Sequence, residues 1–175
     1  MFKKILLGLL GFLIVGAGAL FMFNGKDNYD ATKYDAKVTD GLNVGSKITF
    51  SLPDQFDKKH TINDSTEILI LSFAKASGHL VKEFLSNKPK DYLPKREAFF
   101  VADISPMPTV IRNTFALPDL KKSSFSVLLI YDKVIASQIK NDAQADKIAI
   151  VTLKNKKVIN TIYIQTKEEL NAALK

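Results

Sequence analysis

The apolar residues of this chain fall into short runs. Some runs alternate between apolar and polar residues, and others are almost continuously apolar. The run 47–52 has the two-residue period of a half-buried strand, and the run 60–62, which follows the break at Pro53, predicts its hairpin partner. Three further runs are almost continuously apolar, which is typical of strands covered on both faces. These runs are 68–73, 98–102 and 126–131.

Helical spacing separates these strands. Residues 78–85 carry apolar side chains three and four positions apart, which predicts a first helix. A second helix is expected to open near Pro108 and to end at Pro118. The stretch 132–146 is longer than a tight connection, and its pattern fits either an edge strand or a helical turn.

The C-terminal part predicts a hairpin followed by a helix. Runs 147–153 and 158–164 flank a polar turn, and Thr166 with Glu169 three residues later completes a capping box. Strands therefore alternate with helices, and a second hairpin follows them. This order predicts an α/β fold: a mixed sheet flanked by helices, with an N-terminal β-hairpin before it.

The N-terminus predicts a transmembrane helix ahead of that fold. Lys3 and Lys4 precede an uncharged run from 5 to 23, and these nineteen residues are close to the roughly 20 that span a bilayer. The sequence Ala17-Gly-Ala19 also suits a signal-peptide cleavage site, but the apolar run continues past it. We favour an uncleaved membrane anchor over 1–23, with the two lysines in the cytoplasm.

Three regions follow from these patterns. Residues 1–23 form the membrane anchor or signal peptide, residues 24–43 a polar and flexible tether, and residues 44–175 the folded domain. A short helix or strand around 34–38 is an alternative within the tether. The charge pattern places the domain on the extracytoplasmic side of the inner membrane, in the periplasm of a cell that has an outer membrane.

Composition narrows the function classes. The net charge is +7, but the lysines are spread along the chain without interleaved aromatic residues, so nucleic-acid binding is not expected. Neither a Gly-x-Gly-x-x-Gly motif nor a Walker loop is present, so no nucleotide is expected. The chain contains no cysteine and two histidines, and no cofactor or metal site is predicted.

Two segments carry a resemblance to a known family. The entry segment 45–62 contains Leu52-Pro-Asp54 directly before a buried strand, and 67–80 reads as a first core strand with the loop and helix start that follow it. From about residue 44 onward the chain resembles the thioredoxin-like superfamily, most closely its peroxiredoxin and thiol-disulfide oxidoreductase branch. The resemblance implies a thioredoxin-like mixed sheet flanked by helices.

The chemistry of that family does not carry over. The resemblance places the redox cysteines at Ser77-Gly-His-Leu80, where this chain has no thiol to act as a nucleophile. It also places a cis-proline just before the third core strand, where Phe125 or Ser126 stands here. A cis bond without proline costs about 2.5–4 kcal/mol, so we expect a trans bond.

The remaining residues at this corner define a candidate groove. Ser77 and His79 admit an anion-binding or acid–base role at a helix start, but we favour Ser77 as a plain helix N-cap and His79 as an exposed first-turn residue. The loop that opens the second helix is expected to line the same groove. The candidate residues are Ser77, Gly78, His79, Met107, Pro108 and Phe125.

The sequence thus predicts a membrane-anchored extracytoplasmic domain without thiol redox activity. Its expected role is a binding or scaffold module of the cell envelope, with an envelope protein as partner. The alternative is a non-thiol enzyme that uses Ser77 and His79. His60 stands alone in a hairpin strand, and no functional role is expected for it.

Overall fold

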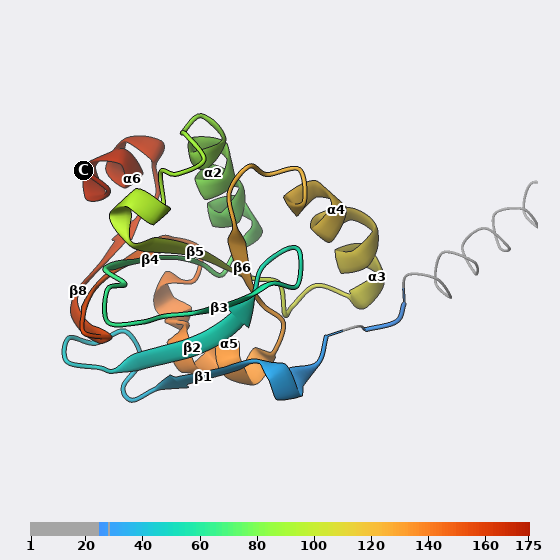
Figure 1. Cartoon of the computed structure of the whole chain (residues 1–175), viewed down its shortest axis with the longest axis horizontal. Helices are drawn as coiled ribbons and strands as arrows, with labels where there is room; N and C mark the ends of the chain where they lie inside the picture. The colour runs from blue at the N-terminus through green and yellow to red at the C-terminus, as the bar shows by residue number, and fades with distance from the viewer. Residues whose placement is uncertain (1–24, 28) are drawn as a thin grey trace, which may run out of the picture.

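The computed structural model describes residues 25–27 and 29–175, which fold into two sheets and their flanking helices (Figure 1). The strands are β1 (Asp35–Val38), β2 (Ile48–Pro53), β3 (Lys59–Thr61), β4 (Ile68–Ser72), β5 (Ala98–Asp103), β6 (Val127–Ile130), β7 (Ile148–Lys154) and β8 (Lys157–Ile164). The α-helices are α2 (Lys75–Ser86), α3 (Thr109–Ile111), α4 (Leu117–Leu120), α5 (Lys133–Ile139) and α6 (Lys167–Ala173). The 3₁₀ helices are η1 (Ala31–Lys33), η2 (Pro94–Arg96) and η4 (Asp142–Gln144), and η3 (Arg112–Ala116) is a π-helical turn.

The larger sheet has the mixed topology that the sequence predicts. Its strand order is β6-β5-β4-β7-β8, with β4 parallel to β5 and antiparallel to β7. Four residues of β4 are buried, as expected for a nearly continuous apolar run at the centre of a sheet. The smaller sheet is antiparallel with the order β1-β2-β3, which confirms the predicted N-terminal hairpin and adds one strand to it.

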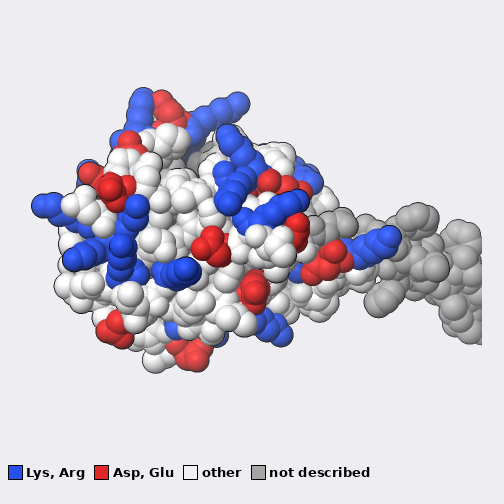
Figure 2. Space-filling model, turned by 60° about the horizontal axis from the view of Figure 1, so that its bottom comes forward, with Lys and Arg blue, Asp and Glu red and all other residues white. Residues whose placement is uncertain are grey.

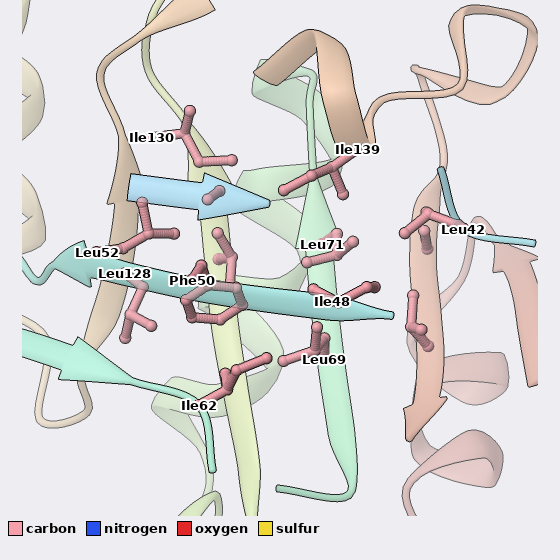
Figure 3. Close-up of a cluster of buried hydrophobic side chains, with 14 of the residues drawn as sticks. Leu42, Ile48, Phe50, Leu52, Ile62, Leu69, Leu71, Leu128, Ile130 and Ile139 are labelled. Atoms are coloured by element: carbon pink, nitrogen blue, oxygen red, sulfur yellow. The ribbon is translucent and has the colours of Figure 1, made fainter. Parts of the chain in front are cut away.

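Both faces of the larger sheet are covered. Successive side chains of a strand point to opposite faces, so Leu69 and Leu71 join one hydrophobic cluster and Ile70 joins the other. In Figure 1, α2 and α6 lie on one face, and the small sheet with α5 lies on the other. Figure 3 shows Ile48 and Phe50 of β2 among the side chains of the first cluster.

The structure selects between alternatives that the sequence left open at two connections and corrects the prediction at a third. Strand β1 lies inside the predicted tether and pairs with β2, so the short strand considered there is the alternative that the structure adopts. The stretch after β6 forms α5, a helix and not an edge strand. Pro118 does not end the second helix, which continues through α4.

A π-helical turn explains why the chain passes Pro118 without a break. Within η3 the Leu117 N–H donates to the Arg112 carbonyl oxygen five residues earlier. This wider turn falls directly before Pro118, which occupies the first turn of α4. Proline lacks an N–H but is tolerated in a first helical turn, where that donor has no helical acceptor.

The C-terminal hairpin and helix match their predicted forms. The turn between β7 and β8 has positive φ at Asn155 (50°) and Lys156 (62°), the conformation of the tight turns that join antiparallel strands. Thr166 accepts from the Glu169 N–H, and the Glu169 carboxylate accepts from the Thr166 N–H, so the capping box is confirmed.

The predicted transmembrane helix lies outside the described residues. Within the described part of the chain, no helix has the length and apolar character needed to cross a bilayer. On the face that Figure 2 shows, basic side chains lie beside acidic ones.

Candidate functional site

A groove of about 650 Å³ lies at the corner where the resemblance places the active site. Side chains from the end of β5 and the following loop, among them Phe100, Ala102, Ile104 and Met107, line its apolar part. One wall is the first half of α2, and the other is the continuous stretch α3, η3 and α4. The wall residues are Ala74, Lys75, Gly78, His79, Lys82, Ile111, Thr114, Phe115, Ala116, Pro118, Asp119 and Leu120.

Ser77 is not the N-cap of α2, which corrects the sequence prediction. The helix begins three residues earlier, with Ala74 in the cap position and no side-chain cap. Ser77 is buried in the first turn, where its Oγ donates to the Ala74 carbonyl oxygen (3.0 Å) and lies 3.0 Å from Ser72 Oγ. Its hydroxyl therefore closes the first turn against β4 and does not line the groove.

Gly78 and His79 do line the groove. A Cβ atom at Gly78 would lie 3.2 Å from Ser72 Oγ, so the small residue lets α2 approach β4 closely. His79 is exposed, as expected for a first-turn residue. In the described part of the chain no hydrogen bond joins Ser77 to His79, so the pair lacks the geometry of an activated nucleophile.

The other three predicted site residues occupy different places. Met107 lines the groove, whereas Pro108 is the N-cap residue of α3 and is exposed outside the lining. Phe125 is buried in the core cluster on the helical side of the sheet. All peptide bonds among the described residues are trans, including those on either side of Phe125.

An ion pair joins the two walls of the groove. Lys82 of α2 pairs with the Asp119 carboxylate of α4, and its Nζ also lies 3.4 Å from the Asp119 carbonyl oxygen. The hydrogen bond from Lys82 is the main cause of a lowered pKa at Asp119. The pair bridges helices that are distant in sequence and sets the spacing of the walls at this end.

Asp103 is the acidic group at the carboxyl end of β5. It is half-buried, and this burial raises its pKa, although the Ser105 N–H donates to its carboxylate (2.9 Å) and opposes the shift. The carboxylate borders the groove and also a smaller cavity of about 260 Å³ beside α5. A carboxyl group in this setting takes up a proton more readily than one in water.

The groove has a mostly apolar lining. The nucleophile candidate Ser77 is buried and hydrogen-bonded to the backbone, and its Oγ lies 3.0 Å from Ser72 Oγ. Among the described residues, no group of three metal-ligating side chains comes together. Two large apolar side chains on the far wall are open to solvent: Phe115 is 63% exposed and Ile111 is 47% exposed.

Sequence reasoning missed the buried polar cluster that follows β2. Gln55 is buried, and its amide donates to the Phe125 carbonyl oxygen (2.8 Å) and accepts from the Val127 N–H (2.8 Å). It thus holds the chain at the position where the family would have its cis-proline. The signal was the polar pair Asp54-Gln55 between an apolar strand and Phe56.

Asp54 and His60 complete this cluster. Asp54 Oδ2 lies 2.9 Å from His60 Nε2, and the N–H groups of Phe56 and Lys58 donate to Asp54 Oδ1. Burial alone would raise the pKa of Asp54, but these hydrogen bonds outweigh it and the pKa is lowered. His60 therefore has a structural partner across the turn between β2 and β3.

Comparisons with known proteins give a fold and no closer relative. No protein-family model matches the sequence, and no curated protein matches it either. A putative thiol:disulfide interchange protein DsbE from Chlorobium tepidum is similar in structure, with a TM-score of 0.50, 16% identity, and coverage of 77% of this chain and 100% of that chain. A putative thioredoxin from Neisseria meningitidis has a TM-score of 0.47 at 18% identity, covering 75% and 91% of the two chains.

A third similar structure is a peroxiredoxin-like protein from Aquifex aeolicus. Its TM-score is 0.48 at 9% identity, and the match covers 79% of this chain and 90% of that chain. The chain has the thioredoxin-like fold, and its sequence contains no cysteine.

Proposed function

We propose that this protein is a membrane-anchored, extracytoplasmic binding module that holds an apolar segment of an envelope protein in the groove beside α2. The observation that carries the proposal is the pairing of an apolar groove with a corner that has no thiol. Thiol-disulfide exchange requires a thiolate, which this corner lacks. We therefore assign the corner a role in binding.

The far wall supports an apolar occupant. Phe115 and Ile111 are large, and both are exposed beside an apolar groove lining. Apolar side chains gathered at a concave surface are typical of binding sites. A partner that covers them would bury area that water now contacts, and full burial of a phenylalanine contributes roughly 1.5–3 kcal/mol.

The membrane anchor and the compartment are part of the proposal. Their support is the run 5–23 and the two lysines before it. A domain held at the membrane meets its partner at a high effective concentration, so a modest groove affinity is sufficient.

Photo-crosslinking in native membranes tests the proposal. A photo-reactive amino acid replaces Ile111, and we expect it to capture one discrete envelope protein. Phe115→Ser should lower that yield by about tenfold or more, because 1.4 kcal/mol corresponds to a factor of ten. Ile159→Ser is the matched control: Ile159 is 49% exposed on β8, and its loss should leave the yield unchanged.

Two results would contradict the proposal. An equal yield from the Phe115→Ser and Ile159→Ser variants would show that the groove wall does not contact the partner. Capture by a probe placed at Ile159 in preference to Ile111 would move the binding surface to the edge strand β8.

A further inference from the structure

We infer that the strap, defined here as Lys26, Asp27 and residues 29–34, docks onto η3 and holds the groove wall close to the membrane surface, so that undocking lets the domain move outward. The inference rests on the proposed membrane anchor. Composition predicted a flexible tether here. The described residues of this segment instead contact the folded domain.

The strap begins with an ion pair to a buried arginine. Asp27 Oδ1 lies 2.7 Å from a terminal nitrogen of Arg112, whose side chain is 4% exposed, whereas the Asp27 side chain is 51% exposed. The Asn113 side-chain amide donates to the Lys26 carbonyl oxygen (2.9 Å). Among the described residues, Arg112 Nε has no hydrogen-bond partner, and Asp27 forms an ion pair with a terminal nitrogen of the same guanidinium.

Stacked tyrosine rings extend the contact between the strap and the domain. The Tyr29 ring lies between Tyr131 and Tyr34, with centroid distances of 4.7 Å and 5.6 Å and interplanar angles of 7° and 13°. Arg112 lies over the ring of Tyr131, 4.8 Å from its centroid. The Tyr34 hydroxyl donates to the Asp57 carbonyl oxygen (3.3 Å). The strap therefore contacts η3, the end of β6 and the turn after β2.

One helical turn serves both the strap and the groove. In η3, Arg112 and Asn113 contact the strap, and the next three residues, Thr114 to Ala116, line the groove. Any displacement of this five-residue turn changes both surfaces. Binding in the groove and docking of the strap are therefore coupled, and each biases the other by the same free energy.

Chain length converts docking into distance from the bilayer. Lys26 is three positions after Phe23, the end of the predicted span, which allows about 10 Å of reach at 3.3–3.6 Å per residue. With the strap released, the first fixed residue is Asp35 in β1, twelve residues from Phe23, and the reach becomes about 40 Å. The docked domain thus presents its groove to a partner segment at the membrane surface.

The test varies the exposed end of the ion pair. Asp27→Asn removes the charge that faces Arg112 without opening the core. Asp30→Asn is the matched control, because it makes the same charge change within the strap, while the Asp30 carboxylate contacts only its neighbours Thr32 and Lys33 among the described residues. Since the chain has no cysteine, Lys121→Cys supplies a unique thiol for a fluorophore near the groove wall.

Two measurements are made on the full-length chain. In hydrogen exchange, Asp27→Asn should speed exchange of amides in the strap at least threefold, and Asp30→Asn should leave docking intact. In vesicles of phosphatidylethanolamine and phosphatidylglycerol with acceptor-labelled headgroups, energy transfer from residue 121 should fall for Asp27→Asn and stay at the wild-type level for Asp30→Asn.

The outcomes separate the two proposals. Unchanged exchange and unchanged energy transfer in Asp27→Asn would overturn the docked strap. Equal losses in both variants would also overturn it, because they would reflect the charge change alone. Release of the unaltered protein from the vesicles by an alkaline wash would instead overturn the proposed anchor, and the exchange result would still decide whether the strap docks.

Discussion

The side-chain amide of Gln55 forms the hydrogen bonds that the backbone of a neighbouring strand would otherwise form. Its carbonyl oxygen and its amide nitrogen contact the two main-chain groups that flank Ser126 in the approach to β6, at 2.8 Å each. Such pairing is what a neighbouring strand would provide at a sheet edge. Gln55 thereby joins the end of the smaller sheet to the larger sheet, at the position where the family resemblance predicts a proline.

We predict that Gln55→Leu destabilises the domain by about 2–4 kcal/mol. A leucine of similar size leaves one buried carbonyl and one buried N–H without partners, and each unsatisfied group costs roughly 1–3 kcal/mol. Urea unfolding of the purified domain measures the loss. Gln165→Leu is the control, since Gln165 is exposed and its change should cost less than about 0.5 kcal/mol; equal losses would refute the bridging role.

Asp54 makes stability depend on pH in the acid range. Its folded-state pKa is lowered, so its contribution is fully present above the ordinary aspartate pKa of about 3.9. The contribution is lost as the pH falls through the folded-state pKa. We predict that Asp54→Asn destabilises the domain by about 1.5–3 kcal/mol at pH 7 and that this difference shrinks below pH 4.

Unfolding midpoints of both proteins between pH 3 and pH 7 measure this effect. Asp64→Asn is a suitable control, because the Asp64 side chain is 72% exposed in its pair with Lys156. A difference between wild type and Asp54→Asn that stays constant down to pH 3 would contradict the assignment of the stabilisation to the ionised carboxylate.

At the scale of elements, sequence periodicity predicted the longer elements with a clear apolar stripe and left the shorter ones as open alternatives. The three core strands and the capped helix α6 formed within a residue or two of their expected bounds. Strand β1 (Asp-Ala-Lys-Val) also alternates between polar and apolar residues, with Ala36 buried and Val38 packed against a core cluster. Four alternating positions are too few to distinguish a strand from a tether by sequence, and the pairing with β2 decides it.

The sequence predicted the location of the candidate groove but not the contacts of its individual residues. The fold brings Gly78, His79 and Met107 to one groove, as parallel-strand topology requires. The start of α2 was misplaced because its cap is Ala74, a residue without a capping side chain. The strap and the Gln55 bridge depend on contacts between residues 70 or more positions apart, which no local period encodes.

The start of α2 has no side-chain cap, so adding a cap there should stabilise the domain. Ala74 has φ −126° and ψ 153°, the extended conformation of an N-cap residue. Ala74→Ser should therefore raise the free energy of unfolding by about 0.5–1 kcal/mol, because a serine hydroxyl can accept from the free N–H groups of the first turn.

Thermal unfolding of Ala74→Ser and Ala76→Ser checks this prediction. Ala76 is exposed inside the first turn of the same helix, where serine is a slightly poorer helix former than alanine. A rise in midpoint for Ala74→Ser and a small fall for Ala76→Ser are expected. A fall in both would show that the backbone there does not take a cap.

At the scale of the whole molecule, the proposed topology predicts where each end of the chain lies. A periplasm-active reporter fused after Lys175 should be active, and the protein should stay in the membrane fraction after an alkaline wash. A soluble form that begins near Leu20 would show that Ala17-Gly-Ala19 is cleaved and would remove the anchor from the proposal.

The strap also determines how the domain responds to mechanical load. Tension between an anchor and a captured partner would reach the Asp27–Arg112 contact before it reached the ladder between β1 and β2. The half-exposed ion pair should yield first, and the stacked rings should peel apart one at a time. The slack released, about 30 Å at 3.3–3.6 Å per residue, would let the envelope shift while the domain stays folded and keeps hold of its partner.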